Sequence, residues 1–114
     1  HSSAMYLGFG TVVYSRSSIF LRRKCSASKF LAEAREFETN CFAYIGELCR
    51  YLMHQPRKED DARNPITKAV GNGLRPDIWM DFKTRYGIER ICEFYGASEG
   101  NAGCVNAFNS FKKM

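Results

Sequence analysis

The chain has 114 residues, enough for one domain, and its 45% hydrophobic and 14% aromatic content excludes an intrinsically disordered segment. No apolar run is long enough to span a bilayer, and the start HSSAMYLGFG lacks the basic and apolar regions of a signal peptide. The composition therefore predicts a single packed segment over residues 1–114.

The formal net charge is +5, and most of the excess lies in Arg22, Arg23 and Lys24 and in the tail residues Lys112 and Lys113. A nucleic-acid-binding face needs a basic stripe with exposed aromatic rings along it. The aromatic residues here recur at core-like spacings, so we expect no nucleic-acid partner. The short clusters are typical of solvated surface, with peripheral association at an anionic membrane as the alternative.

The five cysteines, at positions 25, 41, 49, 92 and 104, form no CxxC motif. Cys41, Cys92 and Cys104 lie in apolar, strand-like runs, so we expect buried, reduced thiols of a cytosolic protein. A zinc site needs close ligand pairs, which His1 and His54 do not supply.

The first part of the chain predicts a strand and a helix. TVVY (residues 11–14) is short and β-branched, which indicates a strand. Residues 26–37 place apolar side chains at the spacing of one helix face, with Ser26 or Ser28 as the N-cap.

The middle of the chain repeats this order. CFAYI (residues 41–45) is a continuous apolar run, typical of a strand covered on both faces. ELCRYLMHQ (residues 47–55) predicts a short helix. The charged residues 57–65, bounded by prolines, predict a surface loop.

The last part of the chain adds one helix and three strands. ITKAV (residues 66–70) predicts a strand. Pro76 then suits the first turn of a helix that Gly87 ends. IERICEFY (residues 88–95) and CVNAF (residues 104–108) predict the final strands.

These elements alternate as strand, helix, strand, helix, strand, helix, strand, loop, strand. The order predicts an α/β fold with a mainly parallel sheet. In such sheets the turns after the strands meet at the carboxyl edge, where ligands bind. Three turns with glycine or small polar residues fall there, at residues 44–47, 71–74 and 95–99.

The turn GNGLR (residues 71–75) has two interpretations. A tight turn explains Gly71 and Gly73 without function; alternatively, the missing Cβ atoms let the backbone approach a flat ligand such as a purine. The third glycine of a dinucleotide fingerprint and the Gly-Lys-Ser/Thr of a P-loop are absent.

The segment YGASEG (residues 95–100) is equally open. It is a polar loop, or else Tyr95 stacks on a base, Ser98 hydrogen-bonds a phosphate and Glu99 binds Mg²⁺. The pattern is too short to separate these interpretations.

Tyr44 and Glu47 flank Gly46. A buried ring and a carboxylate in the first turn of a helix explain them, and pocket lining is the alternative. The sequence has no Ser/His/Asp arrangement and no carboxylate pair placed for glycoside chemistry.

Four segments occur in the order RRKCSASKF, YIGELCRYL, VGNGLRPDIW and EFYGASEGN. Together they resemble the fatty-acid transport protein and very-long-chain acyl-CoA synthetase family, a branch of the adenylate-forming superfamily. YGASEG alone is a superfamily-level signal, whereas YIGELCRYL with GNGLRPDIW is specific to this branch. The resemblance covers nearly the whole chain and implies an internal fragment of the large N-terminal domain of a longer enzyme.

Enzymes of this family condense a fatty acid with ATP and Mg²⁺ to an acyl-adenylate and then transfer the acyl group to coenzyme A. The resemblance therefore implies fatty acid, ATP or AMP, Mg²⁺ and coenzyme A as partners of a cytoplasmic or membrane-associated ligase. The alternative is a non-catalytic α/β module that keeps a partial acyl or adenylate pocket.

The resemblance also implies roles for single residues. Those implied for the nucleotide are Gly71, Asn72, Gly73, Tyr95, Gly96 and Ser98. Glu99 would hold Mg²⁺ and act in catalysis with Ser98. Those implied for the acyl substrate are His1, Tyr44, Ile45 and Gly46.

The family's phosphate loop with its lysine, its ribose-binding aspartate and its C-terminal catalytic lysine have no counterpart in these 114 residues. We therefore expect no ligase activity from this chain by itself. We also expect apolar surface that favours self-association.

Overall fold

The computed structural model describes residues 4–97 and 99–107, and it contains one sheet with the strand order β1-β2-β3-β4. The strands are β1 (Cys41–Ile45), β2 (Lys68–Asn72), β3 (Arg90–Gly96) and β4 (Gly103–Asn106). The first three are parallel, and β4 is antiparallel to β3. The predicted α/β fold with a mainly parallel sheet is confirmed.

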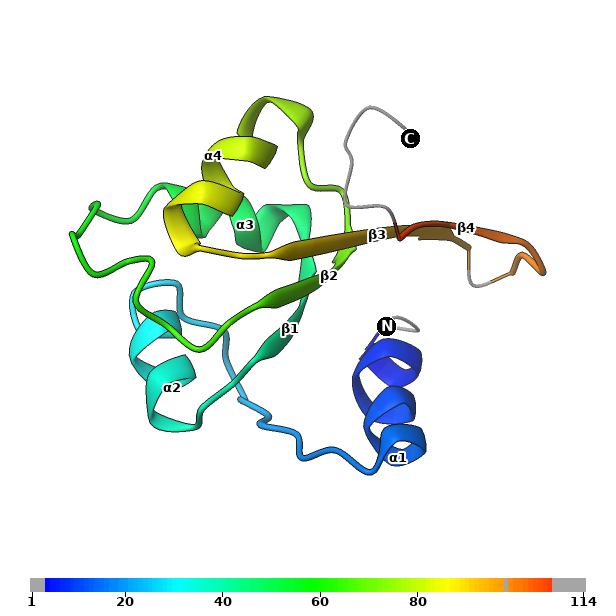
Figure 1. Cartoon of the computed structure of the whole chain (residues 1–114). Helices are drawn as coiled ribbons and strands as arrows, with labels where there is room; N and C mark the ends of the chain where they lie inside the picture. Colours follow the sequence, from blue (N-terminus) through cyan, green and yellow to red (C-terminus); the bar gives the residue numbers. More distant parts are fainter. Residues whose placement is uncertain (1–3, 98, 108–114) are drawn as a thin grey trace.

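The helices are η1 (Ala4–Gly10), α1 (Thr11–Ser15), α2 (Phe30–Glu36), α3 (Gly46–Met53) and α4 (Pro76–Tyr86). Helices α3 and α4 lie together on one side of the sheet, and α1 stands well away from them (Figure 1). Within the described residues, no helix has the length and apolar character needed to cross a membrane.

The core lies between the sheet and the pair α3 and α4. Phe42 of β1 and Ile91 of β3 face inward, and Phe82 of α4 is completely buried among them. The Phe82 ring meets those of Phe42 and Tyr86 edge-on, at centroid distances of 6.5 and 5.3 Å. Each fully buried aromatic ring of this kind stabilises the fold by roughly 1.5–3 kcal/mol.

The prediction of a strand at residues 11–14 is wrong, because these residues form α1. The Ser15 hydroxyl donates to the Thr11 carbonyl (2.7 Å), and Arg16 ends the helix in the left-handed region with φ 56°. Strand propensity depends on packing against neighbouring strands, and the side chains of Val13 and Tyr14 are exposed instead. Without that packing, the β-branched residues continue the helical path of η1.

The prediction that residues 41–45 are covered on both faces is also wrong. Phe42 and Tyr44 are buried, whereas Cys41, Ala43 and Ile45 are exposed. Strand β1 is at the edge of the sheet, and its outward face carries no helix of the α3–α4 layer.

The same geometry corrects the prediction of buried cysteines. Cys41 and Cys104 are exposed and Cys92 is half-buried, while Cys49 of α3 is the fully buried thiol. All five cysteines are free. Burial raises the pKa of Cys49 to about 12, so this thiol is unreactive at neutral pH.

Two helix boundaries bear on the predictions. The prediction that Ser26 or Ser28 caps α2 is wrong, because the N-cap residue is Lys29 and no side chain caps the helix. The hydroxyls of Ser26 and Ser28 lie 3.2 Å apart and hydrogen-bond to each other. Helix α4 has Pro76 in its first turn and ends at Gly87, whose φ is 64°, as predicted.

Arg85 of α4 fastens the segment between α3 and β2. Its guanidinium donates to Asp61 Oδ2 (2.9 Å) and to the carbonyl oxygens of Met53 (3.0 Å) and Gln55 (2.9 Å). The carbonyls at the end of α3 thereby gain partners that the helix itself does not provide. Both side chains of the Asp61–Arg85 ion pair are buried.

Burial acts to raise the pKa of Asp61, but the Lys58 N–H (3.1 Å) and the Arg85 guanidinium outweigh it. The pKa of this carboxyl is therefore lower than its usual value of 3.8. As the pH falls below 3.8, the unfolded chain takes up a proton at Asp61 before the folded protein does. The contribution of Asp61 to stability is therefore present above pH 3.8 and is lost as the pH drops through the lower folded-state pKa.

We predict that Asp61→Asn flattens the fall of unfolding free energy between about pH 5 and pH 2, because the variant lacks the group whose proton uptake drives it. Urea denaturation across that range measures the effect. Asp81→Asn is the matched control, since Asp81 makes an exposed ion pair with Arg57. Equal slopes for the wild type and Asp61→Asn would contradict the prediction.

Candidate functional site at the carboxyl edge of the sheet

The turns after β1 and β2 touch each other through their backbones. A Cβ atom built on Gly46 would lie 1.8 Å from the carbonyl oxygen of Gly73, and Gly73 itself has a φ of 77°. Both positions therefore require glycine, one for the close approach and one for the backbone conformation. Two of the three turns expected to meet at the carboxyl edge do so.

Glu93 of β3 lies beneath these two turns. Its side chain points into the core side of the sheet, with the residue only 9% exposed, and its Oε1 accepts from the Tyr44 hydroxyl (2.7 Å) and from the Leu74 N–H (2.8 Å). Burial, together with the hydrogen bond to Glu93, raises the pKa of Tyr44, so the phenol remains a neutral donor.

No role for Glu93 was predicted from the sequence. The signal that points to it is the alternation in β3, where it shares the inward face with Ile91 although it carries a charge. An acid at an inward position of a strand is uncommon unless the carboxylate has buried partners.

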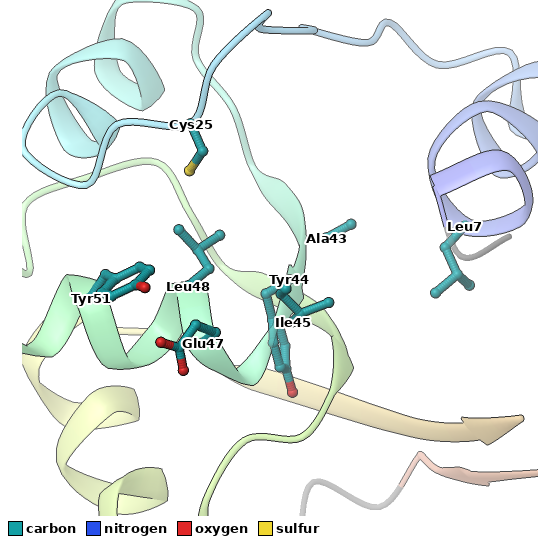
Figure 2. A pocket seen from close by; sticks show the side chains of 8 residues that line it. All are labelled: Leu7, Cys25, Ala43, Tyr44, Ile45, Glu47, Leu48 and Tyr51. Atoms are coloured by element: carbon teal, nitrogen blue, oxygen red, sulfur yellow. The ribbon is translucent and has the colours of Figure 1, made fainter. Parts of the chain in front are cut away.

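A cavity of about 360 Å³ opens beside the end of β1 (Figure 2). Side chains from the N-terminal segment, β1 and α3 line it: Leu7, Cys25, Ala43, Tyr44, Ile45, Glu47, Leu48 and Tyr51. Glu47 is its one charged lining residue, and Arg50 engages that carboxylate and lowers its pKa. The remaining lining is almost entirely apolar, which suits an apolar chain.

The other predicted site residues lie elsewhere or outside the described part. Residues 94–96 extend past the last β2–β3 pair and pair with β4. Tyr95 is 67% exposed there, Gly96 has open space around its Cα, and Glu99 is exposed in the turn that follows. The third turn thus lies on a hairpin that projects from the sheet (Figure 1).

Asn72 is the last residue of β2, next to Gly73, and is half-buried. His1 and Ser98 lie outside the described residues. Among the residues that are described, no group of three or more His, Cys, Asp or Glu side chains is placed to hold a metal ion. Glu99 can supply one carboxylate, which is compatible with Mg²⁺ only if phosphates and water provide the other ligands.

No family model matches the chain. It is 44% identical over 109 residues to the medium/long-chain-fatty-acid–CoA ligase FadD6 of Mycobacterium tuberculosis, an alignment that covers 96% of this chain and 18% of that protein. It is 43% identical over 106 residues to long-chain fatty acid transport protein 6 of Mus musculus, covering 93% of this chain and 17% of the relative.

Human long-chain fatty acid transport protein 1 is 42% identical over 106 residues, covering 93% of this chain and 16% of the relative. The chain is homologous to a segment of the fatty acyl-CoA ligase and fatty acid transport protein family. The predicted resemblance to this family is confirmed. The homology extends over less than a fifth of the length of these relatives.

We predict that Gly46→Ala lowers the free energy of unfolding by about 1–3 kcal/mol, because the added methyl group collides with the Gly73 backbone. Gly96→Ala is the control, since a Cβ there meets no atom within 4 Å. Urea denaturation of both variants measures the difference. If both substitutions had the same small effect, the two turns would not be in the contact described.

Proposed function

We propose that this segment forms part of the substrate-binding region of an ATP-dependent, AMP-forming fatty acyl-CoA ligase. The observation that carries the proposal is the apolar cavity that Tyr44 and Ile45 line, immediately beside the contact between Gly46 and Gly73. The relatives named as fatty-acid ligase and fatty acid transport proteins support the choice of an acyl chain as the occupant.

In the proposed reaction, a carboxylate oxygen of the fatty acid bonds to the α-phosphorus of ATP and pyrophosphate leaves. The coenzyme A thiol then loses its proton to solvent, its sulfur bonds to the acyl carbon, and the bond from that carbon to the phosphate oxygen breaks so that AMP leaves. The cavity would hold the acyl chain, and the turn of Gly71, Asn72 and Gly73 would lie against the nucleotide.

The projecting hairpin would contribute to the nucleotide side. The exposed Tyr95 ring offers a face on which a base can stack, with Gly96 leaving room beside it. Glu99 would provide one carboxylate to Mg²⁺, which lowers the negative charge of the phosphates when it is bound.

We predict that the chain binds dodecanoyl sulfamoyl-adenosine, a non-hydrolysable acyl-adenylate analogue, and that Ile45→Arg weakens this binding about tenfold or more. The substitution places a charge and a longer side chain in the cavity, where the apolar acyl chain would lie. Isothermal titration calorimetry measures the dissociation constants. Val105→Arg is the matched control, because Val105 is comparably exposed (68% against 57% for Ile45) but does not line the cavity.

The wild-type chain offers a second readout of the same binding. Cys25 lines the cavity and Cys41, at the start of β1, does not, and both thiols are exposed. The analogue should slow iodoacetamide alkylation of Cys25, measured by mass spectrometry, and leave that of Cys41 unchanged. Absence of binding in calorimetry, or equal alkylation rates of Cys25 with and without the analogue, would refute the proposed acyl site.

We further predict that the chain alone does not turn over long-chain fatty acid, ATP and coenzyme A. Adenylyl transfer depends on positioned cations and donors around the phosphates, and loss of one such contact costs roughly 3–4 kcal/mol of transition-state stabilisation. A thioesterification assay that follows acyl-CoA formation against a no-enzyme control tests this. Binding without turnover is the expected result, and turnover well above the control would refute it.

A further inference from the structure

The carboxylate of Glu93 occupies a position where an apolar side chain would be expected. It lies on the inward face of β3, two residues after the completely buried Ile91. Burial of a charged group costs free energy unless hydrogen bonds replace its lost water. The two donors that surround Oε1 provide that replacement, and both belong to the proposed binding region.

The two donors come from different strands. The Tyr44 hydroxyl belongs to β1, and the Leu74 N–H follows the Gly71–Gly73 turn at the end of β2. Through one oxygen atom, Glu93 therefore links the middle of β3 to the carboxyl ends of β1 and β2. It also fixes the peptide that joins Gly73 to Leu74, and the carbonyl of that peptide contacts Gly46.

We propose that Glu93 is a positioning residue: its carboxylate holds the glycine turn at the nucleotide side and the Tyr44 ring at the acyl side in one fixed arrangement. The inference rests on the proposed function, because it assigns Glu93 a purpose in the same binding region. In this arrangement Glu93 does not touch the ligand. It acts through Tyr44 and the Leu74 amide, so its loss should reduce binding at both sides together.

The test compares variants of the 114-residue chain in two measurements. Glu93→Met keeps the side-chain length and removes the acceptor, whereas Glu93→Gln keeps an acceptor oxygen and removes the charge. Ile91→Val is the control for general destabilisation, since it trims a buried residue on the same face of the same strand. The measurements are ¹H–¹⁵N spectra of the Gly73 and Leu74 amides and calorimetric binding of dodecanoyl sulfamoyl-adenosine, corrected for the folded fraction.

We expect Glu93→Met to shift both amide resonances and to weaken binding about tenfold, because methionine cannot accept the hydrogen bonds from Tyr44 and Leu74. Glu93→Gln should retain most of the affinity, and Ile91→Val should change neither measurement. If Glu93→Met does not fold, Tyr44→Phe replaces it, with a shifted Leu74 amide and weaker binding expected. The inference would be overturned if the variant that loses this hydrogen bond folded and its amide resonances and affinity were the same as those of Ile91→Val.

The two proposals fail in distinguishable ways. If the wild type binds no analogue, the proposed function is refuted, and the amide spectra alone decide whether Glu93 fixes the turn. If the wild type binds and the acceptor-loss variant binds equally well, the function stands and the positioning role is refuted.

Discussion

The hydrogen bond from Tyr44 of β1 to Glu93 of β3 crosses β2, which lies between them, and the arrangement of the carboxyl edge depends on this bond. In the strand register, Tyr44 of β1 pairs with Gly71 of β2, and Gly71 pairs with Glu93 of β3. A Cβ atom on Gly71 would lie 2.8 Å from two ring carbons of Tyr44. The missing side chain of Gly71 therefore leaves the space through which the phenol reaches the carboxylate. Tyr44, Gly71 and Glu93 are far apart in sequence but form one unit, in which Tyr44 supplies the ring and donor, Gly71 the space and Glu93 the acceptor.

The two glycines of the GNG turn are required for different physical reasons. Gly71 makes room for a neighbouring side chain, whereas Gly73 adopts a left-handed conformation and brings its carbonyl against Gly46. Local geometry therefore explains both glycines, and the approach of a ligand to this turn stays a prediction. Close backbone packing around Gly46 and Gly73 fixes the distance between the β1 and β2 turns, and a preorganised edge of this kind reduces the entropy cost of binding.

Local sequence patterns predicted much of the fold where the cause is local. Pro76, Gly87 and the apolar spacing between them are sufficient for α4, and the apolar runs were sufficient for the existence of the strands. Residues 11–14 could not be predicted in this way, because β-branched residues form strands only where neighbouring strands pack against them. Nor does a run such as CFAYI reveal that its strand is at an edge, with alternate side chains exposed. The role of Glu93 needs the register of three strands, which no single segment contains.

The extension of β3 beyond the end of β2 also explains why the candidate site could be predicted only in part. Parallel strands bring their following turns together only if they end at the same level. Here β2 pairs with β3 as far as Glu93. Strand β3 then continues through Tyr95 with β4 as its antiparallel neighbour. Tyr95 and Glu99 consequently lie beyond the level of the Gly46–Gly73 contact, although their sequence position follows a strand as the others do. A nucleotide that reached both groups would have to extend along this step, with its base near the hairpin and its acyl-bearing end toward the cavity. In the proposed function, the length of that step would limit which acyl-adenylates can reach from the hairpin to the cavity.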